Sequence, residues 1–203
     1  MKRELGHFMI GRSYGGSQEW FRSFMMRIGG CGAETACDSS LYFALHRGVE
    51  NIYPFDLQDI SRKDYVEFAH IMERYLWPRM SGIHRPEIFI NGYTKYLEDR
   101  GVDCIEMDIF RGSEPYDKAA ETVRRQIDSG YPLPTLVLNH RDRTYRDYVW
   151  HWFLINGYEE TEETLLVKAV TYSEYKWLDL RRLWNTGYAN KGGFVLFSLT
   201  GNE

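Results

Sequence analysis

The chain has 203 residues, with 25 Lys and Arg against 29 Asp and Glu, which gives a formal net charge of −4. At 43% hydrophobic and 16% aromatic residues it is too apolar for a disordered chain, and no apolar run is long enough to span a membrane. Its mildly acidic balance argues against nucleic-acid binding, which normally uses a basic face. We expect one domain over residues 1–203, with no nucleic acid and no membrane as partner. The oligomeric state stays open.

The three cysteines, Cys31, Cys37 and Cys104, are too few and odd in number for a disulfide framework. The start of the chain has basic residues but no apolar segment typical of a secretory signal, because Phe8-Met9-Ile10 is followed at once by Gly11. We therefore expect reduced thiols in a cytoplasmic protein.

The first half of the chain is predicted to be helical. Residues 13–30 are rich in glycine and are predicted to form a loop around a short aromatic segment, Trp20–Met26. After them, apolar spacing and boundary residues predict helices, including a capping box at Ser61 and Asp64 and a stop at Pro78. These helices are Cys31–Leu45, Ser61–Trp77, Pro86–Asp99 and Pro115–Ser129.

The second half is predicted to form strands. The strands are Val102–Phe110, Leu133–Leu138, Trp150–Tyr158, Leu165–Tyr172 and Gly193–Leu199, with a short helix at Leu180–Trp184. Brief turns join the last three strands, which favours antiparallel pairing. Helices followed by an antiparallel sheet indicate an α+β fold, with a helical lobe over about residues 15–130 and a sheet lobe over about 131–200.

Cys31 is the first candidate for chemistry because it follows Gly29-Gly30 where a buried helix starts. The N–H groups and partial positive charge of a helix N-terminus stabilise a thiolate and can hold an oxyanion. The alternative is a small residue that merely packs there. Cys37 has the apolar spacing of a packing residue, and Cys104 lies in a strand without a surrounding motif.

A cysteine nucleophile requires a base, and His151 is the best placed of the six histidines. It begins the apolar strand segment Trp152-Phe153-Leu154-Ile155, where a sheet fixes the backbone while the ring can face a cleft. The alternative is an amphipathic residue within an aromatic patch.

Together these segments resemble the papain-like cysteine peptidases. Gly30-Cys31-Gly32-Ala33 opening a helix, followed much later by His151-Trp-Phe-Leu-Ile-Asn-Gly-Tyr158, is similar to the bacterial C39-like branch, which resembles the proteases that trim double-glycine leader peptides. The order of elements agrees over roughly residues 15 to 200. The resemblance implies a papain-like fold in which Cys31 is the nucleophile and His151 the general base.

The resemblance also implies an oxyanion hole made of the Cys31 N–H and an upstream glutamine. Gln18 is the only glutamine before Cys31, although it lies farther ahead than in the family. The family places Asn or Asp at the end of the next strand, and here that strand ends in Ala169-Val170-Thr171-Tyr172-Ser173. Thr171 or Ser173 is expected to orient the imidazole instead, or Glu174 if the strand shifts.

Two hypotheses follow. In the first, the chain is a cysteine peptidase, or an amide acyl transferase on the same fold, that acts on a peptide or protein substrate through a thioester, with no metal and no organic cofactor. In the second, the missing Asn or Asp marks a catalytically impaired papain-like binding module. Neither a metal-binding nor a phosphate-loop motif is present. The charged run at 140–147 is expected to be a solvated loop or a rim of the cleft, with Trp150 and Trp152 either lining the groove or buried in the sheet.

Overall fold

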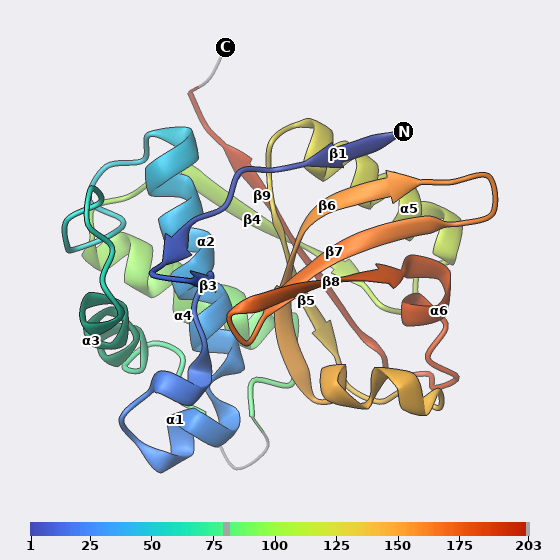
Figure 1. Ribbon diagram of the computed structural model, residues 1–203, viewed down its shortest axis with the longest axis horizontal. Helices are drawn as coiled ribbons and strands as arrows, with labels where there is room; N and C mark the ends of the chain where they lie inside the picture. Colours follow the sequence, from blue (N-terminus) through green and yellow to red (C-terminus); the bar gives the residue numbers. More distant parts are fainter. Residues whose placement is uncertain (79–81, 202–203) are drawn as a thin grey trace.

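The fold, seen in a computed structural model that describes residues 1–78 and 82–201, is α+β and centred on a seven-stranded sheet (Figure 1). The strand order is β4-β9-β5-β6-β7-β8, β1 pairs with β6, and every pairing is antiparallel. The strands are β1 (Lys2–Glu4), β4 (Ile105–Arg111), β5 (Leu133–Val137), β6 (His151–Glu160), β7 (Leu165–Thr171), β8 (Glu174–Asp179) and β9 (Gly192–Leu199). A small separate hairpin joins β2 (Met9–Ile10) to β3 (Ser13–Tyr14).

Helices cover both faces of the sheet. The larger group lies on one side, the smaller on the other, and two short 3₁₀ helices lie in connecting segments (Figure 1). The larger group is α1 (Phe24–Gly29), α2 (Cys31–Arg47), α3 (Arg62–Met72) and α4 (Pro86–Asp99); the smaller is α5 (Tyr116–Asp128) and α6 (Leu180–Trp184); the 3₁₀ helices are η1 (Gln18–Trp20) and η2 (Arg143–Tyr148). Within the described residues, no helix is long and apolar enough to cross a membrane.

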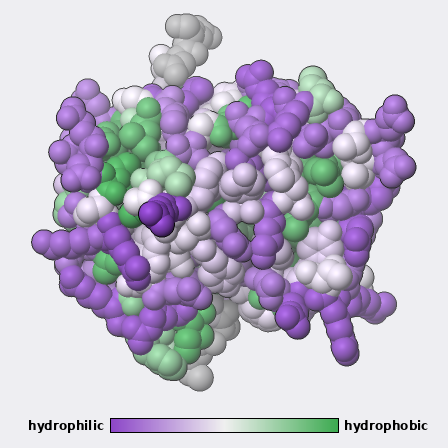
Figure 2. Space-filling view, viewed as in Figure 1, coloured by the Kyte–Doolittle hydropathy of each residue, from purple (hydrophilic) through white to green (hydrophobic). Residues whose placement is uncertain are grey.

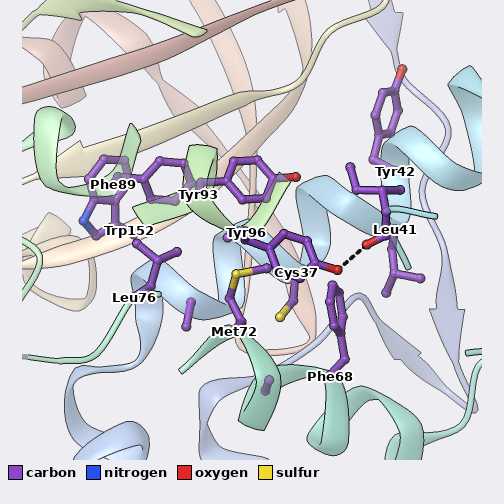
Figure 3. Packing of buried hydrophobic residues seen from close by; sticks show 14 of the residues in the cluster. Cys37, Leu41, Tyr42, Phe68, Met72, Leu76, Phe89, Tyr93, Tyr96 and Trp152 are labelled. Atoms are coloured by element: carbon purple, nitrogen blue, oxygen red, sulfur yellow. Dashed lines mark hydrogen bonds between the residues drawn. The ribbon is translucent and has the colours of Figure 1, made fainter. Parts of the chain in front are cut away.

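Strand alternation divides the apolar side chains between two cores. Val195 and Phe197 of β9 face the core shared with α2, α3 and α4, while Phe194 faces the core shared with α5 and α6. In the first core, Trp152 of β6 stacks on Phe89 of α4 with ring centroids 4.7 Å apart (Figure 3). The sheet is therefore buried on both sides, and β6 connects both cores.

The central helix α2 is buried around most of its circumference. Every residue from Cys31 to Phe43 is buried, and small side chains such as Ala33, Ala36 and Ser40 let neighbouring elements approach closely. The helix ends at Gly48, whose left-handed φ of 66° is the usual helix-terminating conformation. Because α2 packs directly on β6, its first residue lies at the sheet.

The predicted α+β class, the α4 bounds and the position at which α2 begins are confirmed. Pro115 proves to be the N-cap of α5 rather than its first helical residue. The helix predicted to reach Trp77 ends at Met72, because the following turn packs its Tyr75 carbonyl and Leu76 side chain against Gly92 of α4.

Other predictions were wrong in pairing or in kind. The predicted antiparallel pairing is confirmed for β6 and β7, but β9 pairs with β4 and β5 rather than with β7. Residues 24–29, predicted as loop, form α1, which Ser23 caps by accepting from the Met26 N–H at 3.1 Å. The strands β1 and β8 were not predicted because they are exposed edge strands, and their charged sequences lack the alternation of apolar and polar residues.

The close approach at Gly92 is testable. A Cβ there lies 2.4 Å from the Tyr75 carbonyl oxygen, so Gly92→Ala is expected to lower the free energy of unfolding by about 1–3 kcal/mol through overpacking, although alanine is the better helix former. Asn91→Ala, at the neighbouring exposed position, is the matched control and should leave the free energy of unfolding unchanged or slightly raised. Urea unfolding measures both. Equal stability of the two variants would contradict the packing.

Candidate active site

The beginning of α2 packs on β6, so Cys31 lies beside the strand that begins with His151. Cys31 is the first residue of α2, and its N-cap, Gly30, provides no side-chain cap to the first turn. The Cys31 thiol lies against the backbone N–H groups of Gly32 and of Trp152, which directly follows His151 in β6. The structure thus places the Cys31 thiol against the backbone of the residue that follows His151.

Both groups are uncharged at neutral pH in this conformation. Cys31 is only 6% exposed, and burial, with the nearby charge of Glu34, raises the pKa of its thiol to about 11. The backbone N–H groups around the sulfur offset part of that shift. Burial lowers the pKa of His151 to about 4. Among the described residues, no hydrogen bond joins the thiol to the imidazole, so the two neutral side chains do not engage each other in this conformation.

The His151 ring is held by the end of β7 and by the turn that follows it. Its Nε2 lies 2.8 Å from Thr171 Oγ1 and its Nδ1 lies 3.4 Å from the Tyr172 hydroxyl. The Tyr172 ring stacks on the imidazole with centroids 4.7 Å apart. Thr171 therefore stands where the expected orienting residue was sought. The two alternatives lie elsewhere, since Ser173 bonds the Gly16 carbonyl and Glu174 pairs with Lys176.

The turn that carries Tyr172 is strained. Tyr172 and Ser173 link β7 to β8 with φ of 54° and 61°, a left-handed pair of the kind usually made by Asn and Gly. The N-terminal segment holds this turn, because the Tyr14 N–H donates to the Ser173 carbonyl at 3.0 Å and the Ser173 N–H donates to the Gly16 carbonyl at 2.8 Å. Strain of this kind is typical of functional sites.

The sequence analysis missed Glu34, whose carboxylate is 2% exposed. It accepts hydrogen bonds from Gln18 N–H at 2.9 Å, Tyr172 N–H at 3.3 Å and the Thr171 hydroxyl at 3.4 Å. A continuous chain of hydrogen bonds therefore runs from His151 through Thr171 to Glu34. The signal in the sequence was a pair of carboxylates, Glu34 and Asp38, one turn apart on a helix of apolar and small residues.

Asp38 is the second buried carboxylate of α2. The Tyr65 hydroxyl donates to its Oδ1 at 2.7 Å and the Gly16 N–H donates at 3.3 Å, while burial raises its pKa to about 7. Burial and the charge of Asp38 also raise the pKa of Glu34. Within the described residues neither ring nitrogen of His7 has a hydrogen-bond partner; Nε2 lies 3.9 Å from Asp38 Oδ2, and burial lowers the pKa of His7 to about 3. His7 is thus neutral at pH 7 and does not balance the charge of Asp38.

Gln18 is close to the site but its amide is engaged elsewhere. Its Nε2 donates to the Arg27 carbonyl of α1 at 2.9 Å, and its buried Oε1 has no hydrogen-bond partner among the residues that the structure describes. Its backbone N–H reaches Glu34. The amide nitrogen must leave α1 before it can stabilise an oxyanion.

The remaining candidates lie away from this pair. Cys37 is buried in the core beside α3 and α4 (Figure 3), and Cys104 is half-buried before β4. The charged run at 140–147 folds in part into η2, and His140 bonds the Arg182 carbonyl. Trp150 is 53% exposed beside His151, whereas Trp152 is buried. In the described part of the chain, no cluster of three or more His, Cys, Asp or Glu residues forms a metal site.

The chain matches no protein-family model, and a search of curated proteins also finds no match. The geometry of the site is therefore the basis for its functional interpretation.

The buried carboxylate pair makes stability depend on pH. The unfolded chain releases the Asp38 proton near pH 4 and the folded state near pH 7, so this group lowers the free energy of unfolding as pH rises between these values. Asp38→Asn keeps Oδ1 as acceptor for Tyr65 and Gly16. It is expected to remove up to about 1.4 kcal/mol per pH unit of that decline.

Urea unfolding of wild type and Asp38→Asn from pH 5 to pH 8 measures the effect, and the titration of His7 and His151 cancels in the comparison. The variant should gain stability over wild type as pH rises. Parallel pH profiles for the two proteins would contradict the assignment of a protonated buried carboxylate.

Proposed function

We propose that the protein is a papain-like cysteine peptidase, or a related amide acyl transferase, with Cys31 as nucleophile and His151 as general base. The observation that carries the proposal is the packing of α2 on β6, which sets the Cys31 thiol against the backbone next to His151 while Thr171 holds the far side of the ring. A nucleophile at an uncapped helix start, a nearby base and a third group on that base form the usual arrangement for acyl transfer.

The proposed reaction passes through a thioester. The thiol proton moves to His151 Nδ1 as Cys31 Sγ attacks the carbonyl carbon of the substrate amide. The carbon–nitrogen bond then breaks, and the same proton moves from His151 to the leaving amine. Water attacking the thioester completes hydrolysis and regenerates the thiol, whereas an amine attacking it completes acyl transfer. The reaction needs no oxidant or reductant.

The resting contacts define what substrate binding has to change. The Tyr172 hydroxyl contacts Nδ1, the nitrogen that receives the thiol proton in the proposed reaction. Cys31 is buried, and its neutral thiol is a poor nucleophile. A productive complex therefore requires that Tyr172 move from Nδ1 and that the Gln18 amide turn from α1. The strained turn at 172–173 is the element best suited to that change.

The same contacts favour a second candidate function. A buried thiol, an imidazole occupied on both nitrogens and an engaged Gln18 amide are also the features of a catalytically impaired binding module. Its occupant would be a peptide segment that is held without being cleaved. Covalent trapping separates this function from catalysis.

Cys31 is expected to be the residue modified by a peptidyl chloromethyl ketone, because the reagent binds as a peptide substrate would and forms its bond at the nucleophile. Iodoacetamide, which does not need to bind as a substrate, should modify the half-buried Cys104 at least as readily as the buried Cys31. Mass spectrometry of the modified peptides measures the rate at each cysteine.

His151→Ala is expected to slow the directed reaction at Cys31 by at least about 100-fold, the usual contribution of a general base. His140→Ala is the matched control, because His140 lies outside the site and bonds the Arg182 carbonyl. The proposal is wrong if the directed reagent labels Cys31 and Cys104 equally, or if His151→Ala behaves like His140→Ala. Failure to label Cys31 at all supports the binding module.

A further inference from the structure

The geometry points to Glu34 as a positioning residue that acts through Thr171 to keep the His151 proton on Nε2 and the lone pair on Nδ1. This inference deepens the proposed function and rests on it. The Glu34 carboxylate makes its hydrogen bonds to Gln18, Thr171 and Tyr172, and its effect on catalysis passes through the hydroxyl of Thr171.

The direction of each hydrogen bond follows from the acceptors around Glu34. Two of its contacts, with Gln18 N and Tyr172 N, are backbone N–H groups that can only donate. Each carboxylate oxygen therefore accepts one N–H, and with Glu34 ionised the Thr171 hydroxyl donates to Oε1 as a third donor. With its proton directed at Glu34, Thr171 Oγ1 offers a lone pair to His151 at 2.8 Å, so Nε2 must carry the ring proton.

That tautomer is the one the proposed reaction requires. With the proton on Nε2, Nδ1 has a lone pair and can accept a proton from the thiol. If the group at position 34 donated to Thr171 instead, the Thr171 hydroxyl would turn and donate to Nε2. The ring proton would then sit on Nδ1 and block the base. One buried acceptor thus determines which nitrogen of His151 is basic.

Charges near Glu34 also influence Cys31, and the experiment has to separate that effect. The titratable groups that interact electrostatically with Glu34 include Cys31, Cys37 and Asp38 on α2, Tyr65 from α3 and Tyr172 from the β7–β8 turn. A charge on Glu34 raises the pKa of the Cys31 thiol, so removing it alone favours the thiolate. Rates must therefore be compared as the acceleration that His151 provides within each background.

The first experiment is a double-mutant cycle on the directed labelling of Cys31. The rate ratio between His151 and His151→Ala is measured with Glu34 and with Glu34→Gln. In the variant, the amide oxygen is expected to take the shorter bond from Gln18 N–H, which turns the amide nitrogen towards Thr171. The ratio should fall by about tenfold, as is common when a residue that orients a functional histidine is lost. An unchanged ratio would contradict a positioning role.

The second experiment reads the tautomer directly. Nitrogen-15 NMR of histidine-labelled protein at pH 7, assigned with His151→Ala, should show His151 protonated on Nε2 in wild type and shifted towards Nδ1 in Glu34→Gln. Thr171→Val, which removes only the hydroxyl, should disturb the same signal. It also serves as the test if Glu34→Gln does not fold.

Asp38→Asn is the matched control, because it removes a carboxylate from the same buried helix one turn away without contacting Thr171. It should keep the proton on Nε2. The inference is overturned if wild type carries the proton on Nδ1, or if both Glu34→Gln and Thr171→Val retain the wild-type signal. The NMR result does not depend on catalysis, so the tautomer can be confirmed even if labelling shows that Cys31 is unreactive and the proposed function fails.

Discussion

The buried carboxylate of Glu34 is the interaction on which the site depends. A carboxylate inside a protein is costly unless its oxygens accept hydrogen bonds, and Glu34 obtains three donors, from Gln18, Thr171 and Tyr172. These donors belong to the segment before α1, to the end of β7 and to the turn after it. Satisfying one buried group on α2 therefore fixes two distant segments of chain around the start of that helix.

The consequence is a closed arrangement around Cys31. The β7–β8 turn donates a hydrogen bond to Glu34 through the Tyr172 N–H, and its Ser173 bonds the backbone of Tyr14 and Gly16 in the N-terminal segment. The turn held in this way places the Tyr172 ring on His151. Exposed apolar side chains of α1, Phe24 and Ile28, lie just ahead of Cys31 in the chain, and hydrophobic surface is visible at the lower edge of the molecule where α1 lies (Figures 1 and 2). The helix that leads into Cys31 is thus partly uncovered, while the thiol itself is enclosed.

The sequence predicted the elements that have strong local signals. The start of α2 at Cys31 follows from its apolar spacing after Gly29-Gly30, and α4 follows from Pro86 and its periodic apolar residues. The pairing of β9 with β4 and β5 depends on contacts between residues far apart in the chain, which no local pattern encodes. The edge strand β8 depends on backbone pairing with β7 rather than on its own exposed side chains.

The site divides in the same way. Cys31 and His151 were chosen as candidates because helix starts and strand starts leave a pattern in the sequence, and Thr171 was chosen for its place at a strand end. Glu34 and Tyr172 were not among the candidates because their contacts with Thr171 and His151 arise only from folding. A Glu on a helix is ordinarily exposed, so the burial of Glu34 was not expected. The segment Thr171-Tyr172-Ser173 contains no Gly or Asn, the residues that usually indicate a turn with positive φ.

The central claim is that Cys31 and His151 form a reactive pair once Tyr172 leaves the imidazole. A crystal structure of the protein after reaction with a peptidyl chloromethyl ketone tests it most directly. The account predicts a covalent bond from the reagent to Cys31 Sγ, the His151 ring still bonded to Thr171 through Nε2, and the Tyr172 hydroxyl displaced from Nδ1. An adduct on Cys104 alone, or an unmodified Cys31 with Tyr172 still stacked on His151 at saturating reagent, would contradict it.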